Sequence, residues 1–173
     1  HRRVGRNLLL FQAIEQSLRF MLPYVHPDGS ASGAEAMRQY QRHNIERKSL
    51  GPLLEQFRGS VSGTPDLLET GLNGLLAARN ELVHHFYANE RVDFLSPSGG
   101  AAALAYLEEQ YKYAQEWAEI FPAQSLVLLL ILTETNPELA AEYGQHRERL
   151  IAQLPASLEI VDPELRVQLR NLE

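Results

Sequence analysis

Four side chains close together in the sequence could bind an anion and position a proton-transfer group. They are Arg79, Asn80, His84 and His85, within the segment Ala78-Arg79-Asn80-Glu81-Leu82-Val83-His84-His85-Phe86. Arginine presents a planar fork of donors that matches phosphate. Asn80 precedes His84 by four residues, so on a helix it lies one turn below the histidine and can orient its ring. This segment is the candidate chemical site of the chain.

The segment lies near the end of a helical pattern, and Arg79 falls inside the apolar stripe of that helix. Placing residues 68–86 on a wheel at about 100° per residue gives an apolar face made of Leu68, Leu72, Leu75, Leu76, Leu82, Val83 and Phe86. The first helix has a similar face, with Glu15 in the middle of Val4, Leu8, Phe11, Leu18 and Leu22. A charge in an apolar stripe is costly unless it is paired. We therefore expect Glu15 and Arg79 to face each other between these two helices.

Two interpretations of such a pair stay open. It could be a buried ion pair that only fixes how the helices meet, or Glu15 could hold Arg79 at a cleft or subunit seam, ready for an anion.

In a regular helix His84 lies about 140° around the axis from Arg79, so the two side chains are on different faces unless the helix loosens or a second subunit contributes. His84 and His85 could also be two exposed histidines near a helix C-terminus, where positive charge is favourable.

Metal and thiol chemistry are not expected. The chain has no cysteine, which excludes a disulfide framework and fits a reducing, cytoplasmic location. No glycine-rich phosphate loop, HExxH or EF-hand spacing is present, and adjacent His84 and His85 point about 100° apart on a helix, too far to ligate one metal. The apolar run Leu126–Leu132 is too short to span a bilayer, and we interpret it as a fully buried helical stretch. We expect no cofactor, no metal and no membrane association.

Charge is unevenly distributed along the chain. The net charge is -6, yet residues 1–58 hold nine basic against five acidic residues, whereas residues 59–173 hold seven against seventeen. A basic N-terminal third could contact RNA on one face, and its candidate RNA-binding residues are Arg38, Arg42, Arg47 and Lys48. A chance asymmetry on a solvated surface explains the same distribution.

Helical periodicity dominates the chain, and no alternating strand pattern is found. The pattern predicts an all-α, up-and-down bundle of five helices with no significant sheet. The first ends at Pro23, the second is capped by Ser49, and the third begins at Thr64-Pro65 and continues to Phe86 or Ala88. The fourth follows a loop over residues 90–100 and is kinked or restarted by Pro122, and Asn136 caps the fifth. We predict one domain over residues 1–154, followed by a tail or short docking helix over residues 155–173.

An Arg-Asn-x-x-x-His element near the end of a central helix, in a five-helix bundle of this size, resembles the HEPN superfamily (higher eukaryotes and prokaryotes nucleotide-binding domains). The likeness covers roughly residues 3–135. Glu15 agrees with it, since a polar residue of the first helix often supports the motif's arginine in such domains. An arginine also precedes a histidine by five to seven residues at Arg38…His43 and Arg19…His26. Only the pair Arg79…His84 has the asparagine, the helix and the apolar setting.

The resemblance implies a HEPN-like bundle and metal-independent RNA cleavage, often by toxins or defence proteins that act as symmetric dimers. A neutral histidine would take the proton from a ribose 2′-OH, which attacks the adjacent phosphate and leaves a 2′,3′-cyclic phosphate. By this likeness Arg79 stabilises the charge on the phosphate, His84 is the base or acid, Asn80 orients, and His85 is a second candidate for proton transfer. The implied partners are RNA, a second copy of the chain and an antitoxin protein.

One position departs from the family pattern. Some relatives that are paired with a minimal nucleotidyltransferase antitoxin carry a tyrosine two residues after the histidine, where nucleotides are attached. Phe86 stands at that position and Tyr87 follows it, which puts control by nucleotidylation in doubt. The alternative function is a non-catalytic HEPN-type module that binds a partner protein or a nucleotide.

Overall fold

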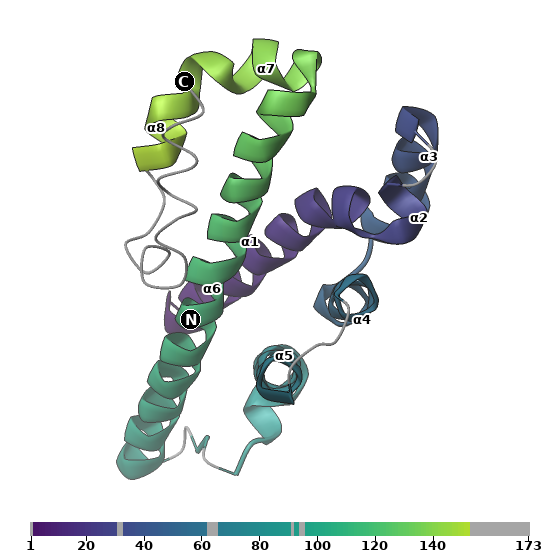
Figure 1. Cartoon of the computed structure of the whole chain (residues 1–173). Coiled ribbons are helices and arrows are strands. Elements are labelled where there is room, and N and C mark those ends of the chain that lie inside the picture. Colours follow the sequence, from purple (N-terminus) through teal and green to yellow (C-terminus); the bar gives the residue numbers. More distant parts are fainter. Residues whose placement is uncertain (1, 31–32, 62–65, 91, 94–95, 153–173) are drawn as a thin grey trace. The chain divides into compact units, whose positions relative to one another are not determined.

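The computed structural model describes residues 2–30, 33–61, 66–90, 92–93 and 96–152, and every regular element among them is helical. The all-α prediction is therefore confirmed for this part of the chain (Figure 1). Contacts group the chain into two compact units, His1–Ala118 and Glu119–Glu173. The predicted domain over residues 1–154 spans both units, and the predicted tail over residues 155–173 lies outside the described residues, as does Thr64-Pro65.

The first unit holds the candidate site and is divided more finely than the predicted helices. Its elements are α1 (Arg2–Val25), α2 (Pro27–Ser30), α3 (Gly33–Tyr40), the π-helix η1 (Gln41–Ile45), α4 (Leu50–Ser60), α5 (Asp66–Asn80), the π-helix η2 (Glu81–His85), the 3-10 helix η3 (Phe86–Ala88) and the first part of α6 (Pro97–Thr135). The third predicted helix thus continues to Ala88, but its last two turns are not α-helical.

Proline positions were poor guides to where helices end. Pro23 lies inside α1, where it is buried, and Pro122 lies inside the uninterrupted α6 between buried Phe121 and Ala123. A proline removes one backbone hydrogen bond from a helix and crowds the preceding turn. Packing of the flanking side chains outweighs that cost at both positions, so the predicted stop at Pro23 and the predicted restart at Pro122 were wrong, whereas the kink at Pro122 stays a prediction.

The core of the first unit forms where α1 packs against α4, and α4 in turn contacts α5. Its fully buried side chains come from all three helices: Ile14, Leu18, Leu22, Leu50, Leu53, Leu54, Leu72 and Leu75. Burying one such side chain contributes about 1.5–3 kcal/mol. This core holds α5 in place and therefore fixes the start of η2, which carries the candidate site.

Two glycines let α5 approach α6 closely. A Cβ atom on Gly71 would lie 2.5 Å from Cζ2 of Trp117, and one on Gly74 would collide with the hydroxyl of Tyr113. That hydroxyl donates a hydrogen bond to the carbonyl oxygen of Gly71 at 2.8 Å. Glycine normally weakens a helix, but here its missing side chain makes room for two aromatic rings.

The start of α1 is joined to α6 by polar contacts. The fully buried Asn7 donates from Nδ2 to the carbonyl oxygen of Leu107 at 2.8 Å. Arg6 lies over the ring of Tyr111 at 3.5 Å and, with Arg3, pairs with Glu108 at 3.0 and 3.3 Å. The first turns of α1 are thereby held beside α6 and close to η3.

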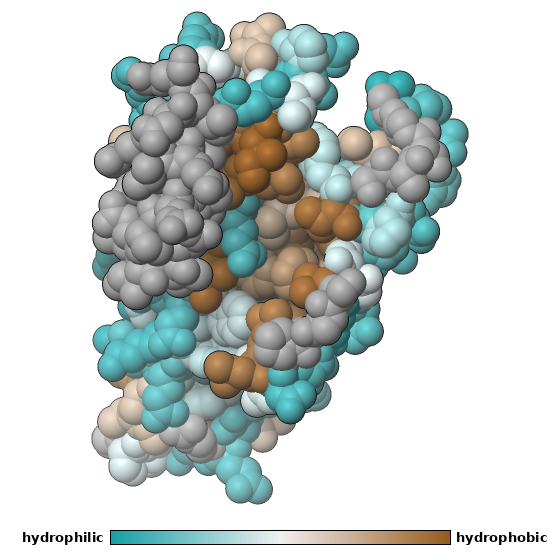
Figure 2. Space-filling view, in the orientation of Figure 1, coloured by the Kyte–Doolittle hydropathy of each residue, from teal (hydrophilic) through white to brown (hydrophobic). Residues whose placement is uncertain are grey.

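The second unit contains the rest of α6, α7 (Pro137–Tyr143), the 3-10 helix η4 (Gly144–His146) and α8 (Arg147–Ala152). Asn136 caps α7 as predicted, because its side chain accepts hydrogen bonds from two backbone N–H groups. Leu130 and Ile151 form a small core, and Figure 2 shows hydrophobic side chains gathered along the second half of α6. The run Leu126–Leu132 is not fully buried, since Ile131 is 45% exposed.

By length and composition, the helix Ser98–Thr135 could cross a membrane, and it is the one such helix among the described residues. Core helices of soluble proteins meet the same criterion. The expectation of no membrane association therefore stays a prediction.

Candidate functional site

The π-helix η2 brings Arg79 and His84 into contact. Nη1 of Arg79 lies 3.2 Å from Nε2 of His84. Backbone bonds in a π-turn join residue i to residue i+5, so the chain turns less per residue than in an α-helix, and His84 comes closer to the face of Arg79 than the roughly 140° of a regular helix. The expected separation of the two side chains was wrong because it assumed a regular helix throughout. The same change of phase turns Val83 outward, and it is 42% exposed instead of lying in the apolar stripe.

This contact fixes which ring nitrogen of His84 carries the lone pair. Arginine can only donate hydrogen bonds, so Nε2 must accept and the ring proton of the neutral imidazole must be on Nδ1. Nη1 of Arg79 also lies 3.2 Å from the side-chain oxygen Oδ1 of Asn80, which accepts from it. Asn80 thus orients the guanidinium and not, as predicted, the histidine ring.

One edge of the Arg79 guanidinium stays available. In the described part of the chain, its polar side-chain partners are Asn80 and His84, and both use Nη1. Nε and Nη2 form the remaining edge, and two parallel N–H groups of this kind match two oxygens of a phosphate. The arrangement can therefore hold an anion next to a neutral imidazole.

Glu15 does not pair with Arg79, contrary to the prediction. Its carboxylate accepts from Nη2 of Arg19 at 3.1 Å and from the backbone N–H of Leu50 at 3.0 Å. Arg19 lies one turn along the same helix, a spacing that favours ion pairs. The first N–H groups of α4 need acceptors, and Ser49 supplies none although it holds the N-cap position. Glu15 is therefore a helix cap for α4.

Two neighbouring hollows lie beside His84. The smaller, about 460 Å³, is lined by His84 with Val4, Leu8, Leu82 and other residues. The larger, about 730 Å³, is lined by Arg2, Arg3 and Leu104 among others. Val4, Phe86 and Tyr87 line both hollows and lie between them. We call the pair of hollows, as its two parts, the α1–η3 groove.

His85 is exposed and lies edge-on to His84, with 6.2 Å between the ring centroids. Among the described residues, no hydrogen bond joins His85 to Arg79. Its role as a second proton-transfer group stays a prediction.

Comparison with known proteins gave no relative. No family model matches the chain, and neither does a curated protein or a solved structure.

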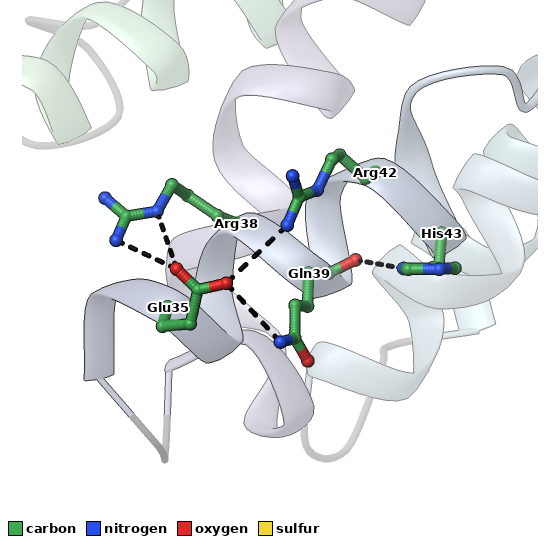
Figure 3. Close-up of polar contacts among 5 residues, drawn as sticks. All are labelled: Glu35, Arg38, Gln39, Arg42 and His43. Atoms are coloured by element: carbon green, nitrogen blue, oxygen red, sulfur yellow. Dashed lines mark hydrogen bonds and ion pairs between the residues drawn. The ribbon is translucent and has the colours of Figure 1, made fainter.

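The basic residues predicted to bind RNA fall into two groups. Arg38 donates to Oε2 of Glu35 from Nε and Nη2 at 3.2 and 3.0 Å, and Arg42 lies 3.6 Å from Oε1 of the same carboxylate (Figure 3). Hydrogen bonds from Arg38 and Gln39 lower the pKa of Glu35, so this carboxylate stays charged and offsets both arginines. Arg47 and Lys48 are exposed, and neither has an ion-pair partner in the described residues.

The same arginine–histidine spacing at Arg38…His43 gives no such contact. Nδ1 of His43 lies 2.9 Å from the backbone oxygen of Gln39, while Glu35 holds Arg38 (Figure 3). A π-helix is present there too, over Gln41–Ile45. Spacing and helix type are therefore insufficient by themselves, and the site at Arg79 also depends on having no carboxylate one turn away.

Sequence reasoning missed the residues that form the groove beside the site. Tyr87 and Leu104 are exposed hydrophobic residues that line it, and Arg2 lies at the start of α1. The available signal was the apolar stripe of the first helix, which already contained Val4 and Leu8. Among the described residues, no group of three or more His, Asp or Glu side chains could hold a metal ion.

Proposed function

We propose that this protein is a metal-independent endoribonuclease of HEPN type, with a role in a toxin or defence system. The observation that carries the proposal is the contact between Arg79 Nη1 and His84 Nε2 at 3.2 Å. It places an anion-binding group and a proton acceptor side by side on one short segment. Both groups are needed to cleave RNA through its own 2′-hydroxyl.

The reaction would proceed in one displacement at phosphorus. A phosphate that binds to Nε and Nη2 of Arg79 draws the guanidinium away from the ring and frees Nε2 of His84. Nε2 then takes the proton of the ribose 2′-OH, and the 2′-oxygen attacks the adjacent phosphorus. The bond from phosphorus to the 5′-oxygen breaks, that oxygen takes a proton from water, and a 2′,3′-cyclic phosphate remains; the proton on Nε2 then returns to the solvent. Arg79 stabilises the negative charge that develops on the phosphate oxygens.

The fold is compatible with this proposal. Along the chain, α1, α4, α5 and α6 are followed by α7 and α8, and the motif follows α5; this order supports the proposal. The short α2, α3 and η1 are inserted between the first and second. The HEPN-like arrangement is part of the proposal.

The homodimer, the antitoxin partner and the cytoplasmic location remain predictions. One reason for the dimer no longer holds, because Arg79 and His84 meet within a single chain. The remaining reason is general, since two-fold dimers are the commonest oligomers. Light scattering at micromolar protein would decide between monomer and dimer.

A non-catalytic module that binds a protein or nucleotide is the second candidate. The observation in its favour is that Nε2 of His84 is already occupied by Arg79, so the imidazole is not free to act as a base in this conformation. An anion must displace the guanidinium before any proton transfer.

The deciding experiment is RNA cleavage in EDTA by the full chain and three variants. His84→Ala should lower the rate about 10²–10⁴-fold, the usual contribution of an acid–base group. Arg79→Gln should lower it about 10²–10³-fold, as loss of a charge-stabilising donor does. His43→Ala is the matched control, since His43 is exposed and follows an arginine at the same spacing, and it should cleave like the parent protein.

The products should carry 2′,3′-cyclic phosphate ends. Cleavage that requires magnesium, or equal rates for His84→Ala and the parent protein, would reject the mechanism and favour the non-catalytic module. Because the His84 side chain is exposed, its removal should lower the unfolding temperature by no more than about 4 °C, the effect of losing about 1 kcal/mol, and this measurement separates loss of function from loss of fold.

A further inference from the structure

The α1–η3 groove has the size and surface of a ligand site. Its two parts, of about 460 and 730 Å³, lie within the usual range of about 300–1,000 Å³ for small-molecule sites. Most of its lining is apolar, from Val4, Leu8, Leu82 and Leu104. His84 belongs to the lining at one end, so the groove is continuous with the candidate site.

An exposed aromatic ring stands at the middle of the groove. Tyr87 is 75% exposed, lines both parts, and packs edge-on to Phe86 with 5.5 Å between the ring centroids. The buried Phe86 therefore supports one side of the Tyr87 ring while much of it faces solvent. Exposed aromatic rings of this kind are platforms on which unpaired nucleic-acid bases stack.

Positive charge lies beside each of the two parts of the groove. Arg79 touches His84 at one end, and Arg2 and Arg3 line the other. Glu108 already pairs with Arg3 at 3.3 Å and with Arg6 at 3.0 Å. Arg2 is exposed and has no ion-pair partner in the part of the chain that the structure describes. An apolar slot between two cationic ends matches a base between two phosphates.

We propose that the α1–η3 groove receives one unpaired base of an RNA strand, which stacks on Tyr87 while its flanking phosphates contact Arg79 at one end and Arg2 at the other. This inference rests on the proposed function and deepens it. A base held in a duplex presents its faces to its neighbours in the stack and cannot enter a slot of this kind. The substrate is therefore single-stranded at the cleavage site, and Tyr87 and Leu104 determine which base fits.

The test uses a short single-stranded 2′-O-methyl RNA, which cannot be cleaved because its 2′-oxygen carries a methyl group. Binding to the full chain is measured by fluorescence anisotropy, together with a blunt duplex of the same sequence. Tyr87→Ala should weaken binding of the single strand about 5- to 100-fold, the range produced by losing one base–aromatic stack. Tyr87→Phe keeps the ring and should bind like the parent protein.

Two further variants complete the comparison. Leu104→Trp fills the groove from an exposed position and should abolish binding of the single strand. Leu67→Ala removes an apolar side chain that is 84% exposed on α5 and lies outside the groove, so it should change nothing. Equal binding of single strand and duplex, or unchanged binding by both Tyr87→Ala and Leu104→Trp, would overturn the inference.

The failure of this inference and that of the proposed function give different results. If the single strand binds in a Tyr87-dependent way but the parent protein does not cleave RNA, the base subsite stands and the ribonuclease proposal fails. If RNA is cleaved in a His84-dependent way but Tyr87→Ala cleaves and binds as the parent does, the ribonuclease stands and the subsite fails. If Leu104→Trp alters only the oligomeric state, the groove is a protein interface and the inference is wrong.

Discussion

Replacing Arg79 with methionine should change the proton position on His84. The substitution keeps a side chain of similar length but removes the donor at 3.2 Å from Nε2. Because His84 is exposed, we take the net worth of this hydrogen bond as about 1 kcal/mol, within the usual range for such bonds. That free energy corresponds to a factor of about five in population. The ratio of the Nδ1–H to the Nε2–H tautomer should therefore fall about five-fold in Arg79→Met.

The measurement is long-range proton–nitrogen NMR on protein labelled with ¹⁵N-histidine. Two other histidines serve as internal controls, and neither should respond to the substitution. His43 lies 2.9 Å from the carbonyl oxygen of Gln39 through Nδ1, so its neutral ring should keep the proton on Nδ1. The ring of His85 packs edge-on to His84 and makes no hydrogen bond among the described residues, and its tautomer ratio should stay constant.

Two results would refute this reasoning. The first is a His84 ring that carries its proton mainly on Nε2 in the parent protein, because Nε2 could not then accept from arginine. The second is a tautomer ratio that is the same in Arg79→Met and in the parent protein. Either result would mean that the contact produced by the π-turn does not persist in solution, and the proposed mechanism would lose its starting geometry.

Four further predictions concern stability. Gly71→Ala should destabilise the fold by about 1–3 kcal/mol in chemical unfolding, because the added methyl group overlaps the tryptophan ring of α6. Gly5→Ala, which meets open space, should instead stabilise α1 by up to about 1 kcal/mol. Glu15→Gln and Arg79→Gln should be additive to within about 0.5 kcal/mol in a double-mutant cycle, and a larger coupling would mean that the two charges pair after all. The hydrogen bond from Arg6 and the nearby charges lower the pKa of Glu108 from its ordinary value of 4.5. The pairs of Glu108 therefore stabilise the fold above that value, and Glu108→Gln should become less destabilising as the pH falls through the lowered pKa.

The helices could be predicted from the sequence because their signals are local. Apolar residues recur with the helical period over the long helices, and Asn136 followed by proline marks the start of α7 as expected. The helix ends at prolines could not be predicted, because they depend on what packs around each proline. Pro23 is buried inside α1, and no pattern in the neighbouring residues shows that.

The candidate residues could be predicted, but their geometry could not. Arg79, Asn80 and His84 lie within six residues of one another in the sequence, so they could be recognised as a group, and His84 is exposed in the structure. A helical wheel assumes one rotation per residue, whereas η2 changes that rotation after Asn80. This difference accounts for the unexpected exposure of Val83, and the contact of His84 with Arg79 needs in addition that no carboxylate one turn away holds the arginine.

The wrong partner predicted for Glu15 has a consequence for the chemistry. A carboxylate beside Arg79 would have neutralised part of the charge needed to hold a phosphate. Glu15 instead accepts from Arg19 and from the first backbone N–H of α4, a donor that the helix must satisfy in some way. The two polar side chains that contact Arg79 in the described residues, Asn80 and His84, are both neutral in the observed arrangement. Neither of these contacts uses Nε or Nη2, and this edge of the guanidinium has the geometry that matches an anion with two oxygens.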